Sequence, residues 1–367
     1  MRIQEFQKKF EQFAPASLAW KSDNIGLLLG SRSSNITNVM VALDVTMDVA
    51  LEAKKKKANF IITHHPLVFH PVRTITPENR VGEILLYCSR NNINIFAAHT
   101  NLDSVPGGVN TALAERLGLS NVRVLSPAKE SLTKIVVFVP EDHVESVAEA
   151  MHLAGAGMFT RYESCSFRSA GIGTFRGMKN AKPFIGKVGK LERVNEVKLE
   201  MFAEKWKINA VTAAMLTSHP YEEVAYDIYP LLNKNTEYGL GAIGDLRSVV
   251  SQKEFLSMVR RTLGAKALRF SGKSAAVRRV AVCGGSGSEC IADAVAQGAD
   301  AMVTGDVKYH TFQEFEQKIL LVDAGHYETE HIVLPVLADK IRELLSLSKN
   351  TGKVFITQHR TNPVHIF

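Results

Sequence analysis

The chain has 367 residues, of which 46% are hydrophobic and 22% charged, and its formal net charge is +7. This length exceeds one ordinary hydrophobic core, and the composition is that of a globular protein rather than a disordered or fibrous one. No apolar run approaches the ~20 residues that span a bilayer, and the N-terminus has no apolar signal core. Four cysteines without a CxxC pair are typical of a reduced protein. We therefore expect a cytoplasmic protein of two or three domains that has no membrane partner.

The positive charge permits an anionic partner without identifying one. A run of four lysines at 54–57 ends a predicted helix, where cations stabilise the C-terminal dipole, so a solvated helix end explains it. Nothing in the chain resembles a helix-turn-helix, a zinc finger or an aromatic RNA-binding strand. Nucleic acid is therefore only a minor alternative as a partner.

In chain order, the first segment begins with an amphipathic helix and then alternates short apolar strands with helices. The strands are predicted at residues 39–44, 60–63 and 93–98, and the helices at 47–58, 79–90 and 109–117. Such alternation is typical of a largely parallel sheet with helices on both faces. Residues 1–130 are therefore predicted to form the first half of a metal-binding α/β core.

The middle segment has a different order of elements. A strand at 134–140, a helix at 141–154, an alternating hairpin strand at 162–177, a helix from 210 and a strand at 225–229 follow one another. This order fits the β-α-β-β-α-β ferredoxin-like unit. Residues 131–235 are therefore predicted to be an α+β domain inserted into the core.

The last segment returns to the first pattern, with strands at 279–283, 301–304 and 319–323 and helices at 289–297 and 329–345. Residues 236–367 are therefore predicted to form the second half of the same core. The predicted fold class is α/β, a discontinuous core of two halves with mainly parallel sheets and one inserted ferredoxin-like domain.

Imidazole and carboxylate groups follow the predicted strands of both halves. His64 and His65 lie at the exit of the strand at 60–63, and Asp103 follows the third strand. His326 and Glu330 stand four residues apart after the strand at 319–323, so a helix there would put them on one face. One such histidine alone is more often structural, but two adjacent ones joined by a second cluster favour a divalent-metal site. Asp103 is the predicted bridging carboxylate, because two close cations need a shared anion.

Other polar residues near strand ends are expected to line the same cleft. His99 is a candidate ligand, an outer partner of a ligand, or an acid/base group. Asp306, Lys308 and His310 follow another strand and are expected to be pocket residues rather than ligands, with His310 a second candidate acid/base. The Gly- and Ser-rich loop at 284–288 opens a predicted helix, which suits either a phosphate cradle or a plain tight turn.

Six motifs occur in a fixed order along the chain: WKSDNIGL at 20–27, THHPL at 63–67, AHTNLD at 98–103, GGVN at 107–110, TGDVKYH at 304–310 and GHYETE at 325–330. Together they resemble the GTP cyclohydrolase I type 2 homologues, also called the NGG-interacting-factor-three-like family. They cover both outer segments of the chain. His70 and Thr311 depart from the family pattern near the pocket, but neither replaces a predicted ligand.

The resemblance implies a dinuclear metal centre whose ligands are His64, His65, Asp103, His326 and Glu330. It also implies a toroidal homohexamer with the metal sites facing an internal cavity, and a PII- or CutA-like inserted domain that trimerises. Histidine and carboxylate ligands without cysteine suit zinc first, with iron, manganese, cobalt and nickel as alternatives.

The leading hypothesis is a metal-dependent hydrolase that acts on a small anionic substrate, either nucleotide-like or phosphorylated. Two divalent ions would activate water, and His99 or His310 would relay a proton. Ring opening of GTP is the activity that the family's name suggests. The alternative is a non-enzymatic metal-handling or regulatory scaffold whose inserted domain senses a small molecule. A transcription-related adaptor, which an older family name suggests, finds no nucleic-acid motif here.

Overall fold

The computed structural model describes residues 1–159 and 161–366 and divides into two compact units. One unit contains Met1–Pro127 and Thr236–Phe367, and the other contains Ala128–Asn235. We call them the outer unit and the middle unit. Among the described residues, none of the helices combines the length and apolarity that a membrane span needs.

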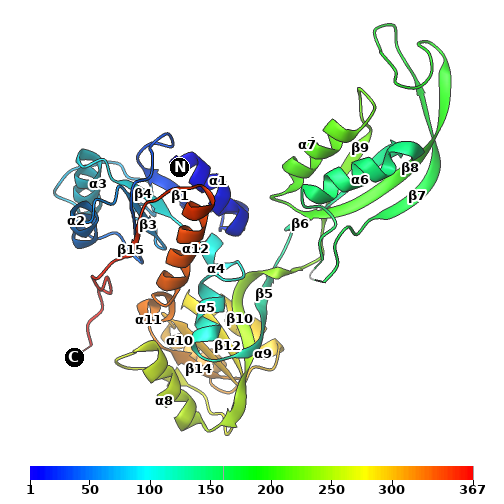
Figure 1. Cartoon of the computed structure of the whole chain (residues 1–367). Helices are drawn as coiled ribbons and strands as arrows, with labels where there is room; N and C mark the ends of the chain where they lie inside the picture. The colour runs from blue at the N-terminus through cyan, green and yellow to red at the C-terminus, as the bar shows by residue number, and fades with distance from the viewer. Residues whose placement is uncertain (160, 367) are drawn as a thin grey trace. The chain divides into compact units, whose positions relative to one another are not determined.

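The first sheet of the outer unit has the strand order β1-β4-β3-β2-β15. Its strands are β1 (Gly26–Leu29), β2 (Val39–Ala42), β3 (Phe60–Thr63), β4 (Asn94–Ala97) and β15 (Val354–Ile356). Four of them run parallel, and β1 lies antiparallel to β4 at one edge. The last strand, β15, comes from the far end of the chain and pairs with β2 (Figure 1). Both outer segments of the sequence therefore build this sheet.

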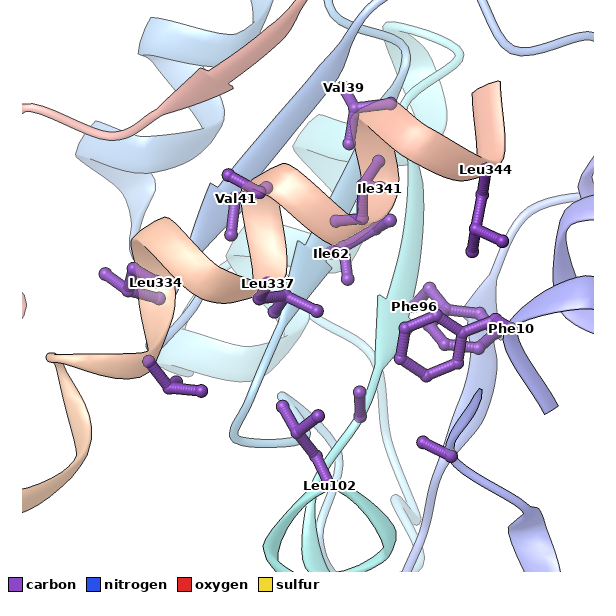
Figure 2. Packing of buried hydrophobic residues seen from close by; sticks show 14 of the residues in the cluster. Phe10, Val39, Val41, Ile62, Phe96, Leu102, Leu334, Leu337, Ile341 and Leu344 are labelled. Atoms are coloured by element: carbon purple, nitrogen blue, oxygen red, sulfur yellow. The ribbon is translucent and has the colours of Figure 1, made fainter. Parts of the chain in front are cut away.

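Helices cover both faces of the first sheet, which explains why its strands are continuously apolar. The helices are α1 (Ile3–Phe13) and α12 (Val333–Leu347) on one face, and α2 (Met47–Lys55) and α3 (Arg80–Arg90) on the other. In β2, Val39 and Val41 contact the cluster that contains α12, whereas Met40 and Ala42 face the opposite cluster. Figure 2 shows the first cluster, in which Leu337 and Ile341 of α12 lie over the sheet.

The second sheet of the outer unit has the order β11-β14-β13-β12-β10-β5. Its strands are β5 (Ser120–Ala128), β10 (Asn235–Val250), β11 (Arg269–Ser271), β12 (Val277–Ser286), β13 (Ala301–Gly305) and β14 (Leu320–Asp323). The central strands β12, β13 and β14 are parallel, while β10 and β11 are antiparallel to their central neighbours. The α/β class with mainly parallel sheets is thus confirmed, with antiparallel strands added at the edges.

The helices that share buried clusters with the second sheet include α5 (Val109–Arg116), α8 (Gln252–Leu263), α9 (Ile291–Ala296) and α10 (Tyr309–Phe315). The start of α8 is fixed by a capping box between Ser251 and Glu254, and Gly264 ends it in the left-handed conformation. The single helix expected at 329–345 is instead two helices, a short α11 (His326–Glu330) followed by α12.

The middle unit has one antiparallel sheet of order β7-β8-β6-β9. Its elements in chain order are β6 (Leu132–Pro140), α6 (Val144–Leu153), β7 (Phe167–Arg176), β8 (Leu191–Glu204), α7 (Ile208–Ser218) and β9 (Tyr226–Leu231). Apolar residues of α6 and α7 share one buried cluster with β6 and β8. Pairing between β6 and β8 ends at Pro140 and Glu196, whereas β7 and β8 stay paired from there to Arg176 and Leu191. The β7–β8 hairpin therefore projects beyond the sheet as a two-stranded ribbon (Figure 1).

Candidate metal centre

Five of the predicted site residues are brought together in the outer unit. His64 and His65 directly follow β3, and Asp103 ends the short helix α4 (Thr100–Asp103) that follows β4. His326 and Glu330 are the first and last residues of α11, which follows β14. Because parallel strands expose their carboxyl ends at one edge of a sheet, each sheet delivers its ligating groups to one place.

Glu330 lies at the centre of this cluster. Its Oε2 atom is 2.9 Å from His65 Nε2 and 3.1 Å from His326 Nε2, and the two Nε2 atoms are 3.1 Å apart. The ligands of a tetrahedral zinc ion with bonds of about 2.0–2.1 Å lie about 3.3 Å from one another. These three residues therefore have the spacing of one face of a metal coordination shell, and we call them the open group, because the two imidazoles are 22% and 38% exposed.

A second set of ligating atoms lies on the other side of Glu330. His64 is fully buried, and its Nε2 is 3.6 Å from Asp103 Oδ1 and 3.6 Å from Glu330 Oε1. Within the described residues, His64 Nε2 and Asp103 Oδ1 have no hydrogen-bond partner. A buried polar atom without a partner is costly, so these residues fit a cation held between them. We call His64, Asp103 and Glu330 the buried group.

Glu330 thus offers one carboxylate oxygen to each group. The sequence predicts Asp103 as the bridging carboxylate, but the described ion-pair contacts join Asp103 to His64, whereas Glu330 contacts all three histidines. The difference arises because α11 places Glu330 one helical turn after His326, pointing at the exit of β3.

Each of the three histidines is oriented by an oxygen behind its ring. Nδ1 of His64 contacts the carbonyl of Ala98 at 2.9 Å, Nδ1 of His65 contacts Asp44 Oδ1 at 2.8 Å, and Nδ1 of His326 contacts Asp306 Oδ2 at 2.6 Å. When Nδ1 donates to that oxygen, Nε2 is left as the lone-pair donor facing the site, as in many metalloproteins.

Of these supporting residues, Asp306 was predicted to line the pocket and Asp44 was not predicted at all. Asp44 follows the apolar strand β2, so the rule that located the other groups at strand exits could have found it. Asp306 has a left-handed backbone with φ of 55°, a conformation that aspartate tolerates better than most side chains.

The contacts in the cluster shift several pKa values. Burial alone would lower the pKa of His65, but hydrogen bonds to Asp44 and Glu330 outweigh it and raise that pKa to about 9. At His326 burial is likewise outweighed by two carboxylates, and its pKa rises to about 10. Burial raises the pKa of Asp103 to about 6 despite the nearby imidazoles. Negative carboxylate charge is therefore concentrated around these histidines. A divalent cation would displace the protons that His65, His326 and Asp103 bind.

His99 stands beside the two groups and is held by Asp23. Its Nδ1 is 2.9 Å from Asp23 Oδ1, and its ring centroid lies 5.1 Å from that of His64 and 5.6 Å from that of His65. The Asp23 side chain is 1% exposed and also accepts hydrogen bonds from the backbone and hydroxyl of Thr100. An imidazole fixed by a buried carboxylate can either transfer protons or ligate a metal through Nε2. Sequence reasoning assigns no role to Asp23, although it lies in the first motif.

The stability of the metal-free protein is expected to depend on Asp23 at acid pH. Burial would raise the pKa of Asp23, but hydrogen bonds from His99 and Thr100 lower it to about 2. A lowered pKa stabilises the folded state above pH 4 by about 1–2 kcal/mol, and this contribution is lost as pH falls from about 4 to 2. Urea unfolding from pH 6 downward should therefore show that the free energy of unfolding differs between wild type and Asp23→Asn, and that this difference disappears toward pH 2. A difference in the free energy of unfolding that stays constant with pH would contradict this role.

Two other predicted pocket residues lie on the surface. His310 is exposed on α10, and the described contacts of its ring are with Gln313 at 3.4 Å and with Tyr309. Lys308, which precedes α10, is also exposed. No described contact joins His310 to the open or the buried group, so its catalytic role stays a prediction.

The loop at 284–288 supports the site through its backbone. Three of its amides donate internally: Gly284 N to Asn110 Oδ1, Gly285 N to Thr329 Oγ1 and Gly287 N to Thr304 Oγ1, at 2.9, 3.0 and 2.9 Å. A phosphate cradle needs such amides to be free to donate to its ligand. The geometry therefore favours the tight-turn interpretation of this loop.

Gly285 is expected to be required for metal binding rather than only for folding. It has φ of 58°, and a Cβ atom there would lie 2.2 Å from Glu330 Oε1. Gly298 is a matched control, because it has φ of 70° and a Cβ atom would meet nothing within 4 Å. Alanine at either position should cost about 1–2 kcal/mol of backbone strain. Only Gly285→Ala should also weaken metal binding, measured by competition with a chromophoric chelator; equal affinities in the two variants would show that Glu330 adapts.

Comparisons with known proteins agree over almost the whole chain. The sequence profile of a family described as Duf34/NIF3 (NGG1p interacting factor 3) matches residues 1–363. The chain is 42% identical over 363 residues to the GTP cyclohydrolase 1 type 2 homolog of Bacillus subtilis, covering 98% of this chain and 97% of that protein. It is 41% identical over 357 residues to the protein of the same name from Halalkalibacterium halodurans, covering 96% of each.

The fold agrees as well. The crystal structure of a Bacillus cereus protein related to NIF3 matches with a TM-score of 0.89 at 40% identity, covering 100% of this chain and 99% of that chain. The motifs, the fold and the full-length match lead to one conclusion: the chain belongs to the Duf34/NIF3 family.

Proposed function

We propose that this protein holds two divalent metal ions, one in the buried group and one in the open group, and hydrolyses a small nucleotide-like or phosphorylated substrate. The observation that carries the proposal is the position of Glu330, since one of its oxygens faces His64 and the other faces His65 and His326. A carboxylate in this position suits two cations that share one anion. Zinc is the first candidate, since the donors are nitrogen and oxygen and the open group has the spacing of a tetrahedral shell.

When bound, the two ions would supply Lewis-acid activation of water and stabilisation of negative charge on the attacked centre. The protein's own contribution to turnover is the pair of His99 and Asp23. Asp23 fixes the His99 ring through Nδ1, so Nε2 can accept or donate a proton at the edge of the cluster. His99 belongs to neither the open nor the buried group, so the pair is available for proton transfer, and this supports hydrolysis over the scaffold.

The substrate class follows from charge and from the relatives. The cationic centre suits an anionic substrate, and the relatives are named GTP cyclohydrolase 1 type 2 homologs. Because three amides of the loop at 284–288 donate internally, phosphate recognition would depend on the metal ions and not on that loop.

Elemental analysis of the purified protein and of Asp103→Ala, combined with a hydrolysis screen over nucleotides, tests this proposal. We expect about two metals per chain in the wild type, with the buried-group metal and turnover both lost in the variant. Two metals without turnover on any nucleotide would replace the hydrolase with the metal-handling scaffold. Unchanged metal content in Asp103→Ala would refute the assignment of the buried group.

We also propose that the protein assembles as a homohexamer whose middle units form trimers. The projecting ribbon and its loop, residues 176–193, carry six lysine or arginine side chains and one glutamate. The rest of the middle unit carries eight basic and twelve acidic side chains. Met178 and Leu191 of the same segment are 82% and 50% exposed. A basic, partly apolar ribbon and a net acidic unit are complementary, which favours contact between the ribbon of one copy and the middle unit of another.

Charge reversal in this ribbon is therefore expected to reduce the oligomer. Lys179, Lys182 and Lys187 are exposed, and replacing all three by glutamate should lower the molar mass measured by light scattering from six chains to fewer. The same triple reversal at Lys54, Lys55 and Lys57 of the outer unit is the control and should leave the mass unchanged. A wild-type protein that is monomeric, or a ribbon variant that stays hexameric, would contradict the proposed contact.

A further inference from the structure

The residues after β15 form a strap that crosses the outer unit and is tied down at three places. Thr357 and Gln358 contact Glu52 of α2, with hydrogen bonds of 2.6 Å from the Thr357 hydroxyl and 3.1 Å from the Gln358 amide. Arg360 and Asn362 both donate to Glu328 Oε1 of α11, at 2.8 and 3.1 Å. We call residues 357–362 the C-terminal strap.

The third tie reaches the metal cluster. The Thr361 hydroxyl donates to Asp44 Oδ2 at 2.8 Å, while the other oxygen of Asp44 contacts His65 Nδ1 at 2.8 Å. A continuous chain of hydrogen bonds therefore runs from the strap through one carboxylate to a histidine of the open group. Because both Asp44 oxygens are engaged, the plane of the carboxylate and hence the His65 ring are fixed.

The strap also holds the other side of the open group. Glu328, which accepts two hydrogen bonds from the strap, lies on α11 between His326 and Glu330. The Arg360 guanidinium lies 5.2 Å from the centroid of the Tyr327 ring on the same helix. The strap thus ties the β3 side of the open group to α11, which supplies its other two residues.

The buried group is oriented differently. His64 Nδ1 contacts the backbone carbonyl of Ala98, which belongs to the segment after β4 and has no described contact with the strap. The chain of hydrogen bonds from Thr361 through Asp44 therefore ends on His65, which belongs to the open group only, whereas the ties to Glu328 hold α11, whose Glu330 both groups share.

We infer that the C-terminal strap is a positioning element of the open group and that Thr361 is its positioning residue, so that the hydrogen bond from Thr361 to Asp44 sets the affinity of the open-group metal and leaves that of the buried-group metal unchanged. This inference rests on the proposed two-metal site. It makes the far end of the chain a part of the centre, although no strap residue is proposed to touch metal or substrate.

The experiment compares Thr361→Val, which keeps the side-chain shape but removes the hydroxyl, with Thr361→Ser, which keeps the hydroxyl. Each zinc-loaded full-length protein is dialysed against a graded series of chelator concentrations, and the metal remaining per chain is measured by elemental analysis. Losing a hydrogen-bonding partner behind a ligand typically costs about 10–100-fold in metal affinity. Asp44 is that partner for His65 and Thr361 acts through it, so we expect Thr361→Val to lose one of two metals at a chelator concentration about 10-fold lower than wild type, the small end of this range, and Thr361→Ser to follow wild type.

Two further measurements separate the possible failures. The melting temperatures of the metal-free proteins should agree, which distinguishes positioning from general destabilisation. Asp44→Asn, which keeps one oxygen to accept from Thr361 but puts an amide NH2 opposite His65 Nδ1, should release the same metal more easily and so shows that Asp44 lies between the strap and the open group. If wild type holds two metals and Thr361→Val releases neither of them more easily, the strap has no positioning role, whatever Asp44→Asn does. If wild type holds no metal, the two-metal proposal itself is wrong, and the role of the strap falls with it.

Discussion

Replacing Glu330 by glutamine is expected to leave the protein without tightly bound metal in either group. Glu330 is 3% exposed and contacts His64, His65 and His326, and one oxygen faces each group. The amide has nearly the same shape, but it loses the charge that offsets two cations and replaces one oxygen by a nitrogen donor. The loss of metal affinity should exceed the ~10–100-fold loss that follows when the hydrogen-bonding partner of a ligand is removed.

Metal content after dialysis, measured by elemental analysis, checks this expectation. Glu314→Gln is the matched control, since Glu314 is an exposed residue of α10 in the same unit, and it should retain both metals. If Glu330→Gln retained one tightly bound metal, Glu330 would belong to a single group and the shared-carboxylate geometry would be wrong.

Replacing His99 by glutamine is expected to lower turnover by about 10²–10⁴-fold while both metals stay bound, because this is the usual contribution of a positioned acid/base group. The side chain of His99 approaches the rings of His64 and His65, and its Nδ1 is occupied by Asp23. Turnover is measured on whichever nucleotide the wild type hydrolyses, together with metal content in the same samples.

His310→Gln provides the comparison for His99→Gln. His310 is exposed and its described contacts lie outside the cluster, so its loss should leave turnover within a few-fold of wild type. If His99→Gln released a metal, His99 would be a ligand of the cluster, which its position near His64 and His65 permits. If His310→Gln reduced turnover as strongly as His99→Gln, the prediction that His310 is an acid/base group would be confirmed.

Much of the fold could be predicted because the strands are short, apolar and buried on both faces. Residues 39–42 and 60–63 are such runs, and parallel strands expose polar residues only at their ends. The same regularity located His64, His65 and Asp103, since each follows a strand of the first sheet, and it located His326 and Glu330 after β14. Local sequence was sufficient wherever a prediction needed only one strand and the residues that directly follow it.

The remaining features depend on contacts between distant parts of the chain. Nothing in residues 354–356 indicates that they pair with β2, and the bond from Thr361 to Asp44 joins residues 317 positions apart. Asp23 lies in a stretch without regular secondary structure and gains its role only when His99 is placed next to it. Likewise, the choice between Asp103 and Glu330 as shared carboxylate depends on the direction of a short helix, which hydrophobic periodicity does not report.

The most direct test of the two-metal centre is anomalous diffraction from a crystal of the zinc-loaded protein, collected on both sides of the zinc absorption edge. We predict two anomalous peaks per chain, one contacting His64, Asp103 and Glu330 and the other contacting His65, His326 and Glu330. A single peak, or peaks bound by residues outside these two groups, would contradict the dinuclear centre on which the proposed function depends.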